Sequence, residues 1–146
     1  MSEKDIESIV KDLVESLEKK DTEKALTFFT DDAIWYTPQG TFKGKNEIKR
    51  YIVWMTKVLE DLKFNLDGVG ILVQGNKAIH QSTYEGKFKG IKVKTANICT
   101  YEFSGDKIKN HWTINDRLSI AKQSATGPIA KKAVNTIVAK SEEGLW

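Results

Sequence analysis

Hydrophobic residues in the first part of the chain recur at the spacing of α-helices. Steps of three, one and four residues between them place these side chains on one face of a helix, with charged residues opposite. The first stripe comprises Ile6, Ile9, Val10, Leu13, Val14 and Leu17, and the stripe of the third helix comprises Ile48, Ile52, Met55, Leu59 and Leu62. Between them, Asp21 is suited to cap a short helix that reaches Thr30, and residues 31–37 have the composition of a strand followed by a turn at 38–40.

After Leu62 the pattern changes to the alternation that is typical of strands. Four strands are expected at about 63–74, 77–89, 92–104 and 107–122, joined by turns at Gly75-Asn76, Gly90-Ile91 and Gly105-Asp106. Gly68 and Gly70 lie inside the first of them and can provide a bend. Gly127-Pro128 then breaks the chain, and an amphipathic helix is expected over about 127–140. The order predicts an α+β fold, in which a strongly curved sheet holds the N-terminal helices in its hollow.

The composition narrows the class of protein. The chain has 146 residues, a length that predicts one domain over 1–146, and a net charge of only +3, which argues against a nucleic-acid-binding module. The acidic start is unlike a signal peptide and no apolar run is long enough to span a membrane, so we expect a cytoplasmic protein that binds no membrane. One cysteine, Cys99, and two histidines leave no disulfide framework and no metal site, and no cofactor-binding motif is present.

Alternation along the last expected strand places Asp116 on an apolar face, between Ile114 and Leu118. A carboxylate is costly to ionise there, which makes Asp116 a candidate general acid or base. The alternative is a structural aspartate that is hydrogen-bonded to the backbone or to an indole N–H. The residues at the alternate positions, which include Arg117, are expected to face outward. The two faces are Ile108, Asn110, Trp112, Ile114, Asp116, Leu118 and Ile120 inside, and Lys109, His111, Thr113, Asn115, Arg117 and Ser119 outside.

The same alternation places polar and aromatic side chains on the inner face of the two preceding strands. Such a mixture is typical of a pocket for a small apolar molecule. His80 is the second candidate for proton transfer, and each of the other residues can equally be part of the core. The candidates for substrate binding are Trp35, Trp54, Tyr84, Asn97, Tyr101 and Trp112.

Three segments resemble a known family. DDAIWYTPQGTFKGKNEIKRYI at 31–52, YEGKFKGIKVK at 84–94 and GDKIKNHWTINDRLSIAKQ at 105–123 are similar to the SnoaL-like polyketide cyclase branch of the nuclear transport factor 2-like (NTF2-like) superfamily. The third segment carries Trp112 and Asp116 at the W-x-x-x-D spacing of that family, followed by Gln123. The resemblance covers about residues 4–123, and it implies a cone-shaped, cystatin-like fold with a mixed, mainly antiparallel sheet.

The resemblance also implies a function. In the cyclase branch an aspartate that matches Asp116 serves an aldol ring closure without cofactor or metal, whereas the histidine that the family often has near Ser82-Thr83-Tyr84 is absent here. The same fold carries ketosteroid-isomerase-like enzymes and non-catalytic binding or dimerisation modules, so these remain alternatives. Homodimers are common in the superfamily. Here the expected dimer face is the outer sheet surface with Ile79, Ile98, His111, Thr113 and Asn115.

Overall fold

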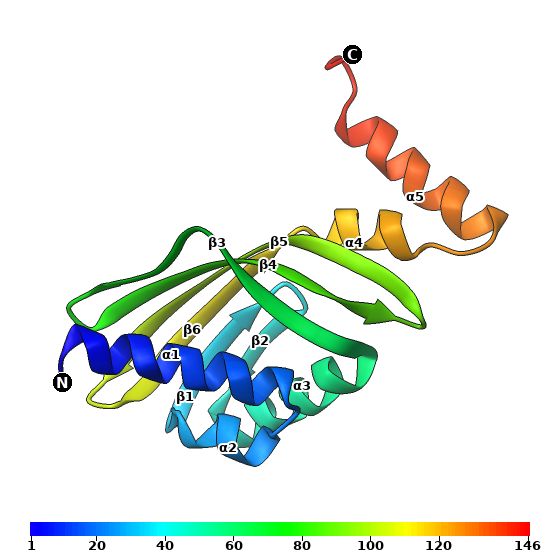
Figure 1. Cartoon of the computed structure of the whole chain (residues 1–146). Coiled ribbons are helices and arrows are strands. Elements are labelled where there is room, and N and C mark those ends of the chain that lie inside the picture. Colours follow the sequence, from blue (N-terminus) through cyan, green and yellow to red (C-terminus); the bar gives the residue numbers. More distant parts are fainter.

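Six strands form one curved, open sheet in the computed structural model, which describes residues 1–146 (Figure 1). The strand order is β2-β1-β6-β5-β4-β3; β1 and β6 are parallel and all other neighbours are antiparallel. The strands are β1 (Phe29–Thr37), β2 (Gly40–Lys43), β3 (Leu59–Gln74), β4 (Lys77–Phe88), β5 (Ile91–Ser104) and β6 (Lys107–Asn115). The helices are α1 (Glu3–Glu18), α2 (Thr22–Thr27), α3 (Gly44–Val58), α4 (Arg117–Ser124) and α5 (Pro128–Ser141). The predicted α+β fold with a mixed sheet and a C-terminal helix is confirmed.

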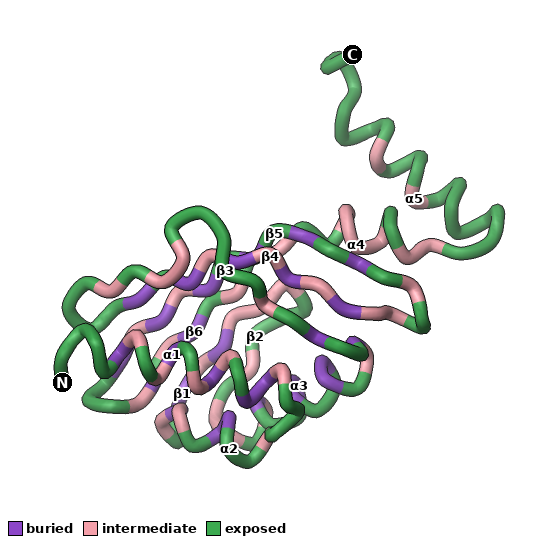
Figure 2. The backbone as a smooth tube through the Cα atoms, in the orientation of Figure 1, coloured by how far each residue is buried: buried purple, intermediate pink, exposed green.

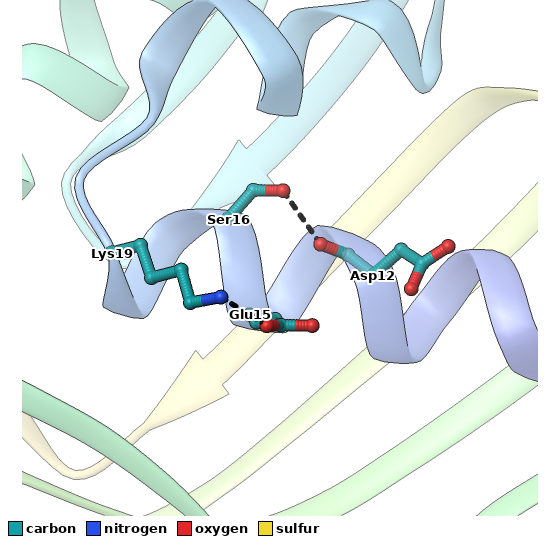
Figure 3. A network of polar contacts seen from close by, with 4 residues as sticks. All are labelled: Asp12, Glu15, Ser16 and Lys19. Atoms are coloured by element: carbon teal, nitrogen blue, oxygen red, sulfur yellow. Dashed lines mark hydrogen bonds and ion pairs between the residues drawn. The ribbon is translucent and has the colours of Figure 1, made fainter.

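Helices α1 to α3 lie together on one side of the sheet, where most buried residues gather (Figures 1 and 2). Helix α1 starts with a capping box in which the backbone N–H of Asp5 donates to the Ser2 hydroxyl. Its buried face carries the predicted apolar stripe and also Ser16, whose hydroxyl donates to the backbone carbonyl of Asp12 at 2.6 Å (Figure 3). This bond satisfies the one polar group on the buried face, while Lys19 and Glu15 pair on the exposed side.

Several element boundaries differ from the prediction. The second helix ends at Thr27 rather than Thr30, and the third ends at Val58, so that Leu59 and Leu62 lie on β3 and not on the stripe of the helix. Residues 40–43, for which no strand was expected, form β2 because they pair with the end of β1 through a hairpin. The last expected strand stops at Asn115, and residues 117–124 form helix α4 instead. The reason is local: Asp116 is the N-cap of α4, and its carboxylate accepts a hydrogen bond from the backbone N–H of Ser119 at 2.9 Å.

The bend that the two glycines of β3 predict is confirmed. Gly68 and Gly70 have φ angles of 53° and 63°, a conformation that residues with a Cβ rarely adopt. The register shifts at the same place, because Leu66 pairs with Ser82 and Ile71 with His80, so that residues 67–70 lie opposite Gln81 alone. This irregularity interrupts the flat ladder between β3 and β4 and contributes to the curvature of the sheet.

A β-bulge reverses the faces of β6. Ile108 pairs with Phe103 and Asn110 with Glu102, which leaves Lys109 as an extra residue without a partner on β5. Since successive side chains of a strand point to opposite faces, one inserted residue exchanges inside and outside from there on. Ile108 and His111 are both buried, whereas Trp112 is exposed on the outer face. The predicted parity of β6 is therefore wrong beyond Lys109, although the parity of β4 and β5 is correct.

Helix α5 projects away from the rest of the chain and packs mainly against α4 (Figures 1 and 2). Most of its residues are exposed, including Ile129 and Ile137 with 86% and 58% of their surface accessible. The extra helix that Gly127-Pro128 predicts thus forms, but none of its residues is buried. None of the helices in this chain combines the length and the apolar character that crossing a membrane requires.

Candidate functional site

A cavity of about 260 Å³ lies between the concave face of the sheet and the helices α1, α3 and α4. Fifteen of its 23 lining residues are hydrophobic, and the others offer amide, hydroxyl, imidazole and guanidinium groups. A mainly apolar wall with a few polar groups is typical of a small-molecule site. The lining residues with polar side-chain atoms include Gln39, Tyr51, His80, Asn97, Cys99, His111, Thr113, Asn115 and Arg117.

Six of the eight candidate residues from the sequence lie on the wall of this cavity. The curvature of the sheet brings them together from β1, α3, β4 and β5, which are distant in the sequence. Their place on the wall is a finding, while their individual roles stay a prediction. The six are Trp35, Trp54, His80, Tyr84, Asn97 and Tyr101.

The other two candidates, Asp116 and Trp112, lie outside the cavity. Asp116 is exposed and caps α4, so its predicted place on the apolar inner face is wrong and the structural alternative, a hydrogen bond to the backbone, is what the structure shows. Trp112 stacks on Tyr36 with ring centroids 5.2 Å apart on the outer face. Both displacements follow from the bulge at Lys109 and from the end of β6 at Asn115.

His111 takes the place on the wall that the sequence assigned to its neighbours. Its ring lies between the rings of Trp35 and Tyr101, with centroid distances of 4.2 and 4.4 Å. Burial lowers the pKa of His111 well below its ordinary value, and the nearby His80 lowers it further. The imidazole is therefore neutral at neutral pH. It is buried and stacked, and its Nδ1 has no hydrogen-bond partner.

The indole of Trp35 is fixed by a hydrogen bond across the cavity floor. Its Nε1–H donates to the Thr113 hydroxyl at 2.9 Å. That hydroxyl lies 3.4 Å from His111 Nε2 and 3.6 Å from Cys99 Sγ, and its proton can be donated to one of them. Thr113 therefore links the aromatic stack to the polar side of the wall. The same burial raises the pKa of the Cys99 thiol, which keeps it protonated and unreactive.

His80 is the second imidazole on the cavity wall. It is buried, with 1% of its surface exposed, and its Nδ1 has no hydrogen-bond partner. Burial lowers the pKa of His80, so the neutral imidazole that can accept a proton is the form present at neutral pH. The cavity wall contains no aspartate or glutamate, and so His80 has no carboxylate to compete with or to orient it. Nor does the structure place three or more His, Cys, Asp or Glu side chains where they could hold a metal ion.

Asn97 lies on β5 opposite Ser82, two residues along the strand from Cys99, the partner of His80. Its side-chain amide donates only weak bonds, to Ser82 Oγ and Cys99 Sγ, both at 3.4 Å. Tyr84 lines the same wall, and burial raises the pKa of its hydroxyl to about 12, which keeps it a hydrogen-bond donor. Asn97 and Tyr84 can thus donate to an oxygen atom of a bound molecule.

The mouth of the cavity has a different chemistry. Arg117 lines it, and Nη1 of Arg117 donates to the backbone carbonyl of Pro38 at 2.9 Å. The hydroxyl of Tyr51, also on the wall, donates to Oε1 of Gln39 at 3.1 Å. Arg117 is exposed, yet it also lines the cavity, so the expectation that it lies away from the pocket is wrong. No aspartate lines the wall beside it.

Three cavity residues that the sequence did not predict were missed for one reason. His111, Thr113 and Asn115 line the cavity, yet the apolar residues between them, Trp112 and Ile114, are the ones that alternation assigns to an interior. In this part of β6 the residues that line the cavity are polar and those on the outer face are apolar, which reverses the usual rule. The three polar residues are therefore not on the outer surface where a dimer face was expected. Nothing in the residues around Lys109 marks the bulge.

Comparisons with known proteins agree with this fold. Three similar solved structures are an NTF2-like protein of unknown function from Burkholderia pseudomallei K96243, a proposed SnoaL-like polyketide cyclase from Shewanella denitrificans OS-217, and IdmH, a proposed polyketide cyclase from Streptomyces antibioticus. Their TM-scores are 0.76, 0.72 and 0.70, with sequence identities of 15%, 12% and 16%. The matches cover 86%, 80% and 82% of this chain and 100%, 94% and 98% of those chains. No curated protein matches the sequence.

The chain therefore has the fold of these NTF2-like and SnoaL-like structures. The family model of the SnoaL-like domain matches residues 10–111, which is more than half of the chain, and the chain belongs to that family. The resemblance that segments 31–52, 84–94 and 105–123 suggested is confirmed at the level of family and fold.

Proposed function

We propose that the cavity binds an apolar, carbonyl-bearing small molecule and that His80 removes a proton from the carbon next to the carbonyl group. The observation that carries this proposal is the unpartnered Nδ1 of His80, a buried polar atom on the cavity wall. Nδ1 of His111 is unpartnered as well, but that ring is stacked between Trp35 and Tyr101, and its Nε2 lies 3.4 Å from the Thr113 hydroxyl. A buried nitrogen without a hydrogen bond destabilises the fold, and a purely structural histidine is normally satisfied by its surroundings. Two structural neighbours are proposed polyketide cyclases, which agrees with a carbonyl-bearing ligand.

In the proposed step, the proton passes from carbon to the neutral imidazole of His80, and the electron pair of the C–H bond becomes an enolate. Asn97 and Tyr84 donate hydrogen bonds to the carbonyl oxygen, whose negative charge develops in the transition state and is full in the enolate. In an isomerisation the protonated His80 returns the proton to a carbon of the enolate. In an aldol closure the enolate carbon forms a bond to a second carbonyl carbon, and the protonated His80 gives its proton to the resulting alkoxide. Both reactions begin with the same step, so one assay tests both.

The assay follows exchange of the acidic protons of 2-tetralone, a two-ring ketone, for deuterium in D2O by NMR. We expect the protein to accelerate exchange, and the substitution His80→Gln to remove the acceleration. Asp116→Asn is the matched control, because it keeps the N-cap and lies outside the cavity, and it should exchange at the wild-type rate. Exchange that is lost in Asp116→Asn and kept in His80→Gln would overturn the assignment.

A non-catalytic binding module is the second candidate, favoured by the position of Asp116 away from the cavity. Calorimetric titration with 2-tetralone separates the two. Binding without any acceleration of exchange supports the module and removes the enzyme, while absence of binding removes both.

We also propose a homodimer through the outer face of the sheet. The support is a group of exposed apolar side chains on β3 to β6, and such a patch is typical of an interface. It consists of Leu72, Ile79, Ile98, Trp112 and Ile114. Light scattering should give twice the chain mass of 16.5 kDa, and Ile98→Lys should shift it to the monomer. Val53→Lys, on exposed α3 surface, is the control that should remain a dimer, and a monomeric wild type would refute the proposal.

A further inference from the structure

The wall of the cavity carries one charge. Arg117 is the only lysine, arginine, aspartate or glutamate among its lining residues, and the interior beyond it is neutral. None of the five ion pairs in the structure involves Arg117. Asp116 precedes it in the chain, but its carboxylate is used to cap α4. The guanidinium therefore has no carboxylate partner, and because Arg117 is exposed and also lines the cavity, it lies where the wall meets solvent.

Arg117 does not stabilise the end of the helix at which it lies. It is the first residue of α4, where the helix dipole disfavours a positive charge, and no acidic residue stands in that first turn. Instead the side chain reaches the turn between β1 and β2, where Nη1 donates to the carbonyl of Pro38 at 2.9 Å. This contact fixes one of the five N–H donors of the guanidinium and leaves the others for a ligand.

Two uncharged groups flank the same opening. The Tyr51 hydroxyl lines the same cavity, and burial raises its pKa, so it stays protonated and uncharged. Gln39 accepts from Tyr51 and presents its side chain to the cavity. The opening thus combines one permanent cation with donors and acceptors that change little in charge, a setting that complements one oxyanion.

We infer that the ligand of this cavity is an amphipathic acid, with an apolar ring system in the interior and a carboxylate that binds Arg117 at the mouth. This inference rests on the proposed function, because it concerns the ligand of the same cavity. A carboxylate and a guanidinium can form two parallel hydrogen bonds, which fixes the orientation of the ligand. The charge stays in partial contact with water at the mouth, so binding avoids the desolvation of an ion in the neutral interior. The carboxylate then determines which end of the ring system reaches His80.

The test compares 2-naphthylacetic acid with 2-naphthylacetamide by isothermal titration calorimetry at neutral pH. The two probes share the ring system and differ in the charge at one end. We expect the wild-type protein to prefer the acid by roughly fivefold or more, as a charge-assisted contact in a partly exposed position gives. Arg117→Gln should bind both probes with equal affinity. Arg50→Gln, which removes the only other arginine and lies outside the cavity wall, should keep the preference.

Each further outcome has one meaning. Equal binding of acid and amide by the wild type overturns the inference about Arg117 and leaves the proposed cavity function intact. Binding of neither probe overturns the proposed binding function, and the inference with it. A preference that disappears equally in Arg50→Gln and Arg117→Gln would arise from net charge, and it would also overturn the inference.

Discussion

The stability of this protein should fall between pH 7.5 and pH 5.5 because of its two histidines. Both are 1% exposed, and burial lowers the pKa of each. An unfolded chain binds protons at both imidazoles below pH about 6.5, while the folded chain keeps them neutral to lower pH. The stabilising contribution is therefore complete above pH about 6.5 and is lost as the pH falls from there toward the lower pKa of the folded state.

The magnitude follows from this difference in proton binding. A histidine has a pKa of about 6.5 in the unfolded chain. If it stays neutral in the folded state, the free energy of unfolding at pH 5.5 is lower by about 1.4 kcal/mol than at high pH. His111, whose pKa is lowered furthest, should contribute that full amount. His80 adds a smaller amount, so the total loss should lie between about 1.4 and 2.8 kcal/mol. Asp5 and Glu15 have lowered pKa values as well, but such carboxylates titrate at lower pH than this window.

Urea unfolding followed by tryptophan fluorescence at pH 7.5 and 5.5, at one protein concentration, measures this loss. His111→Gln changes the absolute stability for several reasons, and the informative quantity is its own difference between the two pH values. That difference should be smaller than in the wild type by about 1.4 kcal/mol. A wild-type stability that agrees at both pH values within about 0.5 kcal/mol would refute the reasoning, since the imidazoles would then be charged in the fold at no cost.

Substitutions at two positions test further contacts. Thr113→Val removes the acceptor of the buried Trp35 indole and should lower the free energy of unfolding by about 1–3 kcal/mol in urea titrations, whereas Thr113→Ser keeps the acceptor and should lose less. Equal stability of the valine variant and the wild type would contradict the hydrogen bond. Asp116→Ala removes the N-cap of α4 and should lower the free energy of unfolding by about 1 kcal/mol, while Asp116→Asn should leave it nearly unchanged. Both variants should bind 2-tetralone as the wild type does. A large loss of binding in either variant would place Asp116 in the site.

Much of the fold follows from the sequence because its signals are local and repeated. The stripe of α1, the turns at Gly75-Asn76 and Gly105-Asp106, and the bend at Gly68 each need only a few neighbouring residues to be recognised. The wall residues of β4 and β5 could be predicted for the same reason, since those strands pair without a register shift and the period of two holds throughout.

The rest of the site depends on contacts that no local pattern contains. The bulge at Lys109 is a property of the pairing between β5 and β6, and one unpaired residue is enough to exchange His111 with Trp112. The end of β6 depends on whether Asp116 caps a helix or continues a strand, and Leu118 and Ile120 fit either outcome. In both cases we assigned the apolar residues to the inner face, and this assignment was wrong, because on β6 it is the polar residues His111, Thr113 and Asn115 that line the cavity.

The bulge in β6 also bears on how relatives of this protein can diverge. Substitutions change one side chain of the wall at a time. The loss of the single residue Lys109, by contrast, would restore the regular alternation and turn His111, Thr113 and Asn115 outward together, while Trp112 and Ile114 would turn inward. Binding cavity and outer face would be remodelled in one step, without a change in any of these five residues. Among homologues, the length of the segment between Ile108 and Asn110 is therefore a better guide to shared ligand chemistry than the identity of the residues that follow it.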